Sequence, residues 1–150
     1  MRKIEFRGKT SFSKVWAYSR ALYYSENGNT YFVYVDEEND DEVYFEQVDP
    51  ETVGQFTGLL DKNGKKIYEG DIIHIKGHTI DTDYGVVTWH QNGYFYIDDS
   101  FGEFPRDCVK PIGDFFECIR SNYRCCLKDV SFYVSGNIHD KKELLKKKEY

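Results

Sequence analysis

The chain has 150 residues, of which 26 are acidic and 20 are basic, and its formal net charge is -6. An acidic balance works against general binding to the phosphate backbone of nucleic acids, which requires basic surface. No apolar run is long enough to span a membrane, and the first residues lack the apolar core of a signal peptide. The sequence therefore predicts a soluble, intracellular protein.

Aromatic residues make up 17% of the chain, with 13 Tyr, 11 Phe and 2 Trp, and hydrophobic residues make up 40%. Tyr and Phe favour pleated surfaces, so this composition indicates a fold rich in β-strands. The first 50 residues agree, with alternating or β-branched runs at 3–7, 13–18, 30–35 and 43–48 and a hairpin-type turn at 26–29. We expect an antiparallel meander over residues 1–50, in which 30–35 is a central strand.

An acidic run, Asp36–Glu42, separates two of these predicted strands. Its carboxylates and Asn39 are hard oxygen donors of the kind that bind a divalent cation. The run lacks the spaced ligands and the turn glycine of an EF-hand, and like charges favour an extended, solvated loop. We interpret it as a solvated loop, with metal binding as the alternative. After the next strand, residues 49–52 predict a turn or a single helical turn.

The densest turn chemistry lies in residues 53–73. Asp61–Gly64 has the composition of a hairpin turn, because Asp and Asn bond to their own backbone and Gly accepts a positive φ. Gly70–Asp71 makes a second break, and residues 72–75 then open a β-branched strand. The predicted order is an extended segment, a hairpin turn, a short segment, a tight turn and a strand.

Two further strands are predicted after this stretch, at 85–90 and 94–97, with a hairpin turn at 91–93. Residues 79–84 are polar and predict a connection rather than a strand. A turn, a strand that follows Gly-Asp, a Gly-Val-Val strand and a hairpin are typical of a small SH3-like barrel. We expect this barrel-like core over residues 53–112, as an analogy of pattern that assigns no function by itself.

The last part of the chain, residues 113–150, is predicted to be a C-terminal segment of the same domain. Residues 130–134 read as a strand, and Asp140 and Glu143 form a capping-box pattern that predicts a short helix over 141–148. No repeat or low-complexity linker interrupts the chain. The predicted fold is therefore a single domain over 1–150, mainly β with an α+β composition.

Histidine and aspartate side chains offer the clearest candidates for chemistry. The histidines are His74, His78, His90 and His139, and His78 with Asp81 and Asp83 makes a candidate metal cluster. A polar surface loop explains the same residues, and we favour that interpretation. The sequence has no Ser-His-Asp arrangement, nucleophile elbow, P-loop or Rossmann fingerprint. We therefore predict no enzyme activity, no cofactor and no metal, with a metal-dependent enzyme as an alternative.

The four cysteines are Cys108, Cys118, Cys125 and Cys126. Adjacent cysteines are poorly spaced for zinc, and no C-x-x-C pair occurs. In a cytosolic protein we expect reduced thiols that serve as small apolar side chains. The alternative is a redox or metal role for this cluster together with His139.

A second alternative is binding to single-stranded nucleic acid. Small barrels present aromatic side chains on which bases stack, surrounded by basic residues. The candidate set here is Lys62, Lys65, Lys66, Trp89, Tyr94 and Tyr96. The competing interpretation is that the aromatic residues pack against one another in the core and that the lysines are ordinary turn residues. The acidic net charge favours the competing interpretation.

The stretch 53–73 also resembles a known family. The matching residues are Gln55–Leu59, Asp61–Lys65 and Ile67–Ile73, and the flanking segments Met1–Lys9, Val134–His139 and Glu143–Leu145 fit as well. The chain resembles the YopX family of bacteriophage and prophage proteins over both ends and the middle. The resemblance implies a phage-encoded protein in the cytoplasm of a bacterial host, and it supplies no functional residues.

The preferred functional interpretation is self-association. An aromatic-rich β protein has more large apolar side chains than one small core covers, and edge strands invite pairing. We expect a non-enzymatic homo-oligomer that binds a host or phage macromolecule. The expected interface comprises the amino-terminal meander and the region 115–134.

Overall fold

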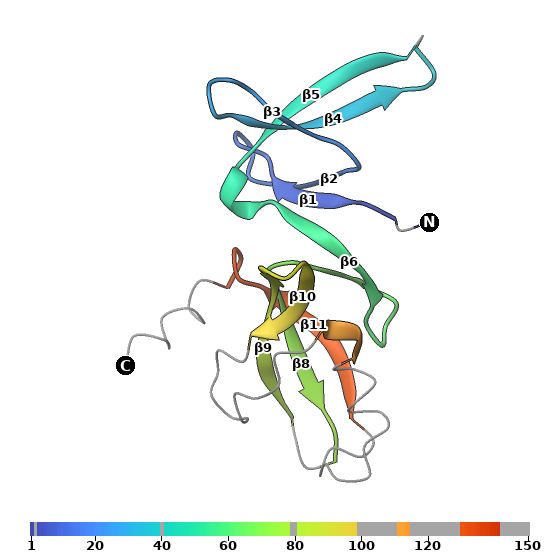
Figure 1. Ribbon diagram of the computed structural model, residues 1–150, viewed down its shortest axis with the longest axis vertical. Coiled ribbons are helices and arrows are strands. Elements are labelled where there is room, and N and C mark those ends of the chain that lie inside the picture. The colour runs from blue at the N-terminus through green and yellow to red at the C-terminus, as the bar shows by residue number, and fades with distance from the viewer. Residues whose placement is uncertain (2, 40, 79–80, 99–110, 115–129, 142–150) are drawn as a thin grey trace. The chain divides into compact units, whose positions relative to one another are not determined.

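The structure is a computed structural model that describes residues 1, 3–39, 41–78, 81–98, 111–114 and 130–141 (Figure 1). The described residues form eleven β-strands, the short 3-10 helix η1 and a helical stretch at 112–114, and the strands pair in antiparallel fashion. The predicted mainly β fold is confirmed. The chain divides into two compact units, Met1–Gly58 and Leu59–Tyr150. That both units act as one domain stays a prediction.

The first unit contains two small sheets. Its elements are β1 (Phe6–Lys9), β2 (Trp16–Ser19), β3 (Leu22–Tyr24), β4 (Thr30–Asp36), β5 (Glu42–Val48) and η1 (Pro50–Thr52). Strand β1 pairs with β2, and β3, β4 and β5 form a meander with β4 in the centre. A bridge between Thr10 and Val48 joins the two sheets. The predicted strands at 30–35 and 43–48 are confirmed as the pair β4 and β5, and β1 and β2 begin three residues later than predicted. Strand β3, which completes the meander, was not predicted.

The core of the first unit is small. Phe32 on β4 and Val48 on β5 are fully buried, and Phe56 in the strand that follows η1 is also buried. Gly8 allows β1 to approach this core, because a Cβ there would lie 3.2 Å from the ring of Phe32. Among the described residues, apolar side chains on the other face of the β3–β4–β5 sheet, such as Val35, Val43 and Phe45, are about half exposed.

The predicted helical turn at residues 49–52 is confirmed as η1. The side chain of Asp49 caps it by accepting a hydrogen bond from the amide of Glu51, at 3.3 Å. Strand β6 (Gly54–Leu60) follows and pairs with β1 through Gln55 and Gly54. It crosses the boundary between the two units, so it belongs to both.

The second unit is built on a four-stranded sheet of order β10-β9-β8-β11. Its strands are β7 (Lys66–Tyr68), which neighbours β6, and β8 (Asp71–Lys76), β9 (Asp81–His90), β10 (Tyr94–Asp98) and β11 (Ser131–Asn137). The predicted succession of turns and strands from 53 to 97 is confirmed. The described strands form open sheets that do not close on themselves, so the SH3-like barrel is not confirmed.

One face of this sheet carries the larger core of the chain. Ile73 and Ile75 of β8, Val87 of β9 and Phe132 of β11 are buried there, together with Ile67, Tyr84, Phe95, Ile97, Ile112 and Val134. Side chains alternate between the two faces of a strand. His74 and Lys76 therefore lie on the opposite, outer face of β8.

Strand β9 begins at Asp81, so the predicted polar connection over 79–84 is wrong for the part that the structure describes. Asp81 pairs with Lys76 and Asp83 pairs with His74, each across the strand boundary. The opposite charges of Lys76 and Asp81, 3.7 Å apart, and the hydrogen bond between His74 and Asp83 stabilise the pairing of polar residues that have little β-propensity of their own. The polar composition of residues 81–83 did not indicate a strand, because the contacts that stabilise it come from β8.

Several predictions fall outside the described residues. The terminal helix over 141–148 lies there apart from Lys141, as do Cys108, Cys118, Cys125 and Cys126. The predicted interface region 115–134 is described only from residue 130 onward.

Candidate functional site

The turn between β6 and β7 is organised by the carboxylate of Asp61, which is almost fully buried. Its Oδ1 atom accepts hydrogen bonds from the amides of Asn63 at 2.8 Å and Lys65 at 2.9 Å. Its Oδ2 atom accepts a third from the amide of Val134 on β11, at 3.0 Å. The amide of Lys62 donates to the carbonyl of Phe132, so the turn lies along the edge of β11. This covers an edge that would otherwise be unpaired.

The second turn of the same stretch fixes the start of β8. Gly70 has a φ of 84°, which favours a residue without a side chain, and its amide donates to the carbonyl of Val87 at 2.8 Å. The next residue, Asp71, is fully buried and accepts a hydrogen bond from the amide of Tyr68 at 2.8 Å. These residues of the stretch that resembles YopX therefore build turns and join strands.

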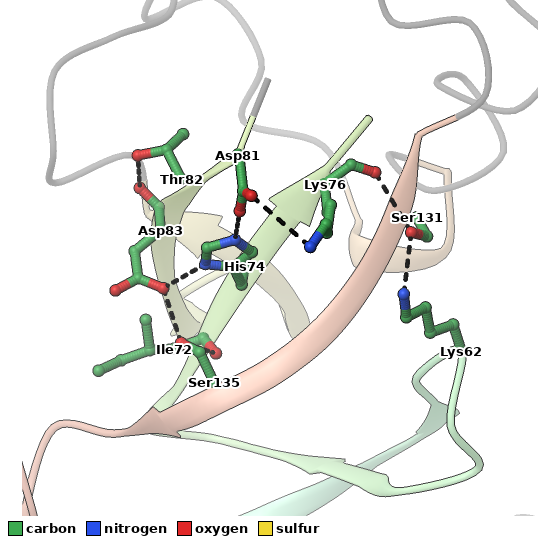
Figure 2. Close-up of polar contacts among 9 residues, drawn as sticks. All are labelled: Lys62, Ile72, His74, Lys76, Asp81, Thr82, Asp83, Ser131 and Ser135. Atoms are coloured by element: carbon green, nitrogen blue, oxygen red, sulfur yellow. Dashed lines mark hydrogen bonds and ion pairs between the residues drawn. The ribbon is translucent and has the colours of Figure 1, made fainter. Parts of the chain in front are cut away.

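A polar cluster lies on the outer face of β8, β9 and β11 and consists of His74, Asp81, Asp83 and Ser135 (Figure 2). The Nδ1 atom of His74 lies 2.9 Å from Asp83 Oδ1, and its Nε2 atom lies 2.7 Å from Asp81 Oδ1. The hydroxyl of Ser135 donates to the same oxygen of Asp83 at 2.7 Å. Three strands are thus joined by side chains as well as by their backbones.

Two carboxylates flank the ring of His74, and a carboxylate only accepts hydrogen bonds. Both contacts are satisfied together when both ring nitrogens carry a proton and donate. The hydrogen bond from His74 lowers the pKa of Asp81 below its usual value. Partial burial raises the pKa of Asp83, but hydrogen bonds from Ser135 and His74 together outweigh it, and the pKa lies below its usual value.

Cations and an aromatic ring border the polar cluster. The ring of Tyr133 packs on that of His74, with centroids 4.7 Å apart, and Lys62 Nζ lies 5.1 Å from the centroid of Tyr133. Lys62 also donates to the hydroxyl of Ser131 at 3.2 Å, and that hydroxyl donates to the carbonyl of Lys76 at 3.2 Å (Figure 2). These contacts join the hairpin turn between β6 and β7 to β11, and β11 to β8.

The polar cluster contains serine, histidine and aspartate, residue types that occur together in catalytic sites. Here the hydroxyl of Ser135 donates to Asp83, and both ring nitrogens of His74 contact carboxylates. Over the described parts of the chain, no group of three or more His, Cys, Asp or Glu side chains is arranged to hold a metal ion. The arrangement is suited to holding strands together.

The structure divides the predicted metal set of His78, Asp81 and Asp83. Both aspartates contact His74, and no hydrogen bond or ion pair joins either of them to His78 among the described residues. The alternative metal set named His78, but the pairing register of β8 and β9 brings the ring of His74 to the two carboxylates. The charged residues at the ends of the acidic run 36–42 also bond locally, with Asp36 accepting from the side-chain amide of Asn39 at 2.8 Å.

The predicted nucleic-acid set is not brought together on one surface. Trp89 pairs across the strands with Phe95, whereas Tyr94 pairs with His90 and Tyr96 pairs with Thr88. Directly opposed residues share a face, so Trp89 lies on one face of the sheet and the two tyrosines lie on the other. Lys62 lies beside Tyr133, and Lys65 and Lys66 lie at the hairpin of β6 and β7.

One face of the β3–β4–β5 sheet, within the amino-terminal meander that the sequence suggested as an interface, carries exposed apolar side chains. It consists of Tyr23, Tyr31, Val33, Val35, Val43 and Phe45, and we call it the meander face. Phe45 is 57% exposed and Val35 is 55% exposed. The ring of Phe45 lies 5.8 Å from that of Tyr23 and 6.5 Å from that of Tyr31, both edge to face. The apolar run 30–35 indicated a central strand, and nothing in the sequence showed that one side of it is uncovered.

In the parts of the chain that the structure describes, none of the helices has the length and apolar character of a membrane span. No curated protein matches the chain. Among solved structures, the chain is similar to the crystal structure of protein EF1440 from Enterococcus faecalis. The two are 21% identical, with a TM-score of 0.50, and the match covers 95% of this chain and 97% of that chain. At this identity the similarity shows a shared fold.

The family resemblance of the turn-rich stretch extends over nearly the whole chain. The model of the family described as YopX protein matches residues 5–146, which includes both compact units. The chain therefore belongs to the YopX family.

Proposed function

We propose that this protein is a non-enzymatic accessory protein of a phage or prophage that acts in the host cytoplasm as a homo-oligomer and binds a host or phage macromolecule. The observation that supports the proposal is the meander face. Burial of apolar surface contributes roughly 25 cal/mol per Å², so an uncovered face of this kind favours association. Contiguous exposed apolar patches mark interfaces between proteins.

The identity of the partner in the oligomer follows from symmetry and from the shape of the face. Soluble proteins most often assemble with copies of themselves, and two-fold pairs bring the same patch together from both copies. Two sheets pack face to face at about 10 Å when apolar side chains fill the space between them. The meander faces of two copies provide such side chains on both sides.

The polar cluster supports the non-enzymatic part of the proposal. In the polar cluster the Ser135 hydroxyl is bound to Asp83, and both ring nitrogens of His74 contact carboxylates. A catalytic serine needs a base that accepts its proton, and a catalytic histidine needs a ring nitrogen that can exchange a proton with the substrate.

Light scattering after size exclusion tests the proposal. At micromolar concentration we expect a defined oligomer whose mass does not change when a short single-stranded oligonucleotide is added. The double variant Tyr23→Lys with Val35→Lys puts charges on the meander face and should give a monomer. Tyr24→Lys is the matched control, because Tyr24 is 68% exposed on the neighbouring position of the same strand but points to the other face.

Two results would contradict the proposal. A monodisperse monomer of the unchanged protein would remove the homo-oligomer, and a larger, salt-sensitive complex with the oligonucleotide would indicate nucleic-acid binding instead.

A further inference from the structure

Strand β5 lies at the edge of its sheet. Its last residues are covered, because the amide of Ser11 donates to the carbonyl of Gln47 at 2.9 Å and Thr10 bridges to Val48. The preceding part, residues 42–46, is exposed, and none of the described strands lies beside it. An edge strand with unpaired backbone groups is a template for another strand.

The hydrogen bond to Ser11 shows which backbone groups of β5 point outward. The carbonyl of Gln47 faces away from β4, and successive residues of a strand point their backbone groups to alternate sides. The amides and carbonyls of Val43 and Phe45 therefore point outward as well. A hydrogen bond on the far side of β4 leads to the same orientation. Val33 pairs with Phe45, and the amide of Val33 donates to the carbonyl of Ala21 on the β3 side, away from β5.

The side chains along this edge differ between the two faces. Val43 and Phe45 belong to the meander face and are 49% and 57% exposed. On the other face, the Tyr44 hydroxyl donates to Glu42 at 2.7 Å, and the Tyr34 hydroxyl donates to Glu46 at 3.2 Å. The carboxylates of Glu42 and Glu46 therefore lie on either side of Tyr44 along β5, on the face opposite the apolar meander face.

We infer that the β5 edge binds an extended peptide segment in which basic and apolar residues alternate. Such a segment adds a strand to the sheet by pairing with the backbones of Val43 and Phe45. Its apolar side chains extend the meander face, and its Lys or Arg side chains lie opposite Glu42 and Glu46. Basic and apolar residues must alternate in the bound peptide, because successive residues of a strand point to opposite faces of the sheet.

A second copy of β5 fits this edge poorly. With Tyr44 on the two-fold axis, Glu42 lies opposite Glu46 of the other copy, and directly opposed like charges are destabilising. With Val43 on the axis, Phe45 lies opposite Asp41. With Phe45 on the axis, Val43 lies opposite Gln47, whose carbonyl already accepts a bond from Ser11. Nucleic acid is also disfavoured, because the same carboxylates repel phosphates.

Fluorescence anisotropy with labelled synthetic peptides tests the inference on the full chain. We expect binding of a peptide of about seven residues that alternates Lys and Val, a length that matches a typical strand. A peptide that alternates Glu and Val should not bind. The Lys/Val peptide N-methylated at alternate residues should also fail, because it lacks the donors that pair with the edge. Equal binding of all three peptides would overturn the inference.

Variants of the protein locate the peptide on the edge. Val43→Pro removes an outward amide, keeps an apolar side chain and keeps the pairing with β4, and it should weaken binding by about tenfold. Val43→Thr keeps the amide and is the matched control. The double variant Glu42→Gln with Glu46→Gln should weaken binding by about three- to tenfold through lost cross-strand charge pairs. Unchanged binding by both the proline and the glutamine variants would overturn the inference, even if one of them folds poorly.

The inference specifies the kind of partner for the proposed binding function and rests on that function. Separate experiments can nevertheless contradict the homo-oligomer and the peptide-binding edge. Tyr23→Lys with Val35→Lys tests association through the meander face, whereas Val43→Pro compared with Val43→Thr tests the outward amide of β5. If Val43→Pro abolished the oligomer seen by light scattering while Val43→Thr kept it, the edge would be occupied by a second copy and the inference would be wrong.

Discussion

At the scale of single residues, Asp61 shows how a family signature acts through structure. Its carboxylate accepts bonds from the amides of Asn63, Lys65 and Val134, the last of which is 73 residues away in sequence. A buried donor that loses its acceptor costs roughly 1–3 kcal/mol. One side chain thus fixes the hairpin turn and holds it on the edge of β11.

The first prediction concerns this side chain. Asp61→Ala should lower the free energy of unfolding by about 2–4 kcal/mol, because it leaves buried amides without an acceptor. Urea denaturation followed by circular dichroism measures the change. Asp36→Ala removes a carboxylate that also accepts a backbone amide, from Glu38, but in an exposed turn, and it should have a much smaller effect. Equal effects of the two substitutions would show that Asp61 has no special role.

The second prediction concerns the acid sensitivity of the polar cluster. The pKa values of Asp81 and Asp83 are lowered in the folded protein. Their contribution to stability is therefore present above the unfolded value of about 3.9 and is lost as the pH falls through the folded values. Asp83→Asn should make the fall in the urea midpoint between about pH 5 and pH 3 shallower than in the unchanged protein. Identical pH profiles would contradict this assignment.

At the scale of elements, β4 and β5 show that the same hairpin presents two chemically different faces. The apolar side chains of the meander face lie on one side, and tyrosine–glutamate hydrogen bonds lie on the other. Partial burial, and then the charge and hydrogen bond of Glu46, raise the pKa of Tyr34 to about 12. A raised phenol pKa is a test of whether the two strands hold these side chains together in solution.

The third prediction uses that pKa. Nuclear magnetic resonance of ¹³C-labelled tyrosine should show Tyr34 titrating at about 12, and Glu46→Gln should lower this value because the negative neighbour is removed. Stability linked to Tyr34 is present below the unfolded pKa of about 10 and is lost as the pH rises through the folded value. Glu51→Gln, on η1, is the control and should leave Tyr34 unchanged. The same titration in both variants would exclude the Glu46 contact.

At the scale of the whole molecule, the two compact units differ in how well they cover their apolar side chains. The second unit buries a core of residues from β7 to β11, whereas the first buries few large side chains and leaves the meander face exposed. Small units that bury little surface are marginally stable alone and are often stabilised by association.

The fourth prediction follows from this imbalance. If the meander faces associate, the thermal midpoint of the first unit should rise with protein concentration, because binding of another copy stabilises the folded state. Scanning calorimetry at several concentrations measures this rise. Tyr23→Lys with Val35→Lys should abolish the concentration dependence, whereas Tyr24→Lys should keep it. A midpoint that is independent of concentration in the unchanged protein would contradict self-association.

The sequence by itself determined the local features of this protein. The turns at Asp61–Gly64 and Gly70–Asp71, the helical turn at residues 49–52 and the strands at 30–35 and 94–97 were all predicted. Their signals are local, since glycine conformation, side-chain capping and β-propensity act within a few residues. The family was also identified from the sequence, because its signature consists of these turn residues.

Only the tertiary structure decided which side chains meet and which faces remain uncovered. His74 rather than His78 contacts the two aspartates because of the register between β8 and β9, which shifts at Ile73 and His74. Trp89 and Tyr94 lie on opposite faces for the same kind of reason. A shift of one residue moves every side chain of a strand to the other face, so these outcomes depend on long-range pairing. The open edge of β5 and the exposed meander face likewise depend on which elements pack together, and no single segment of the sequence encodes that.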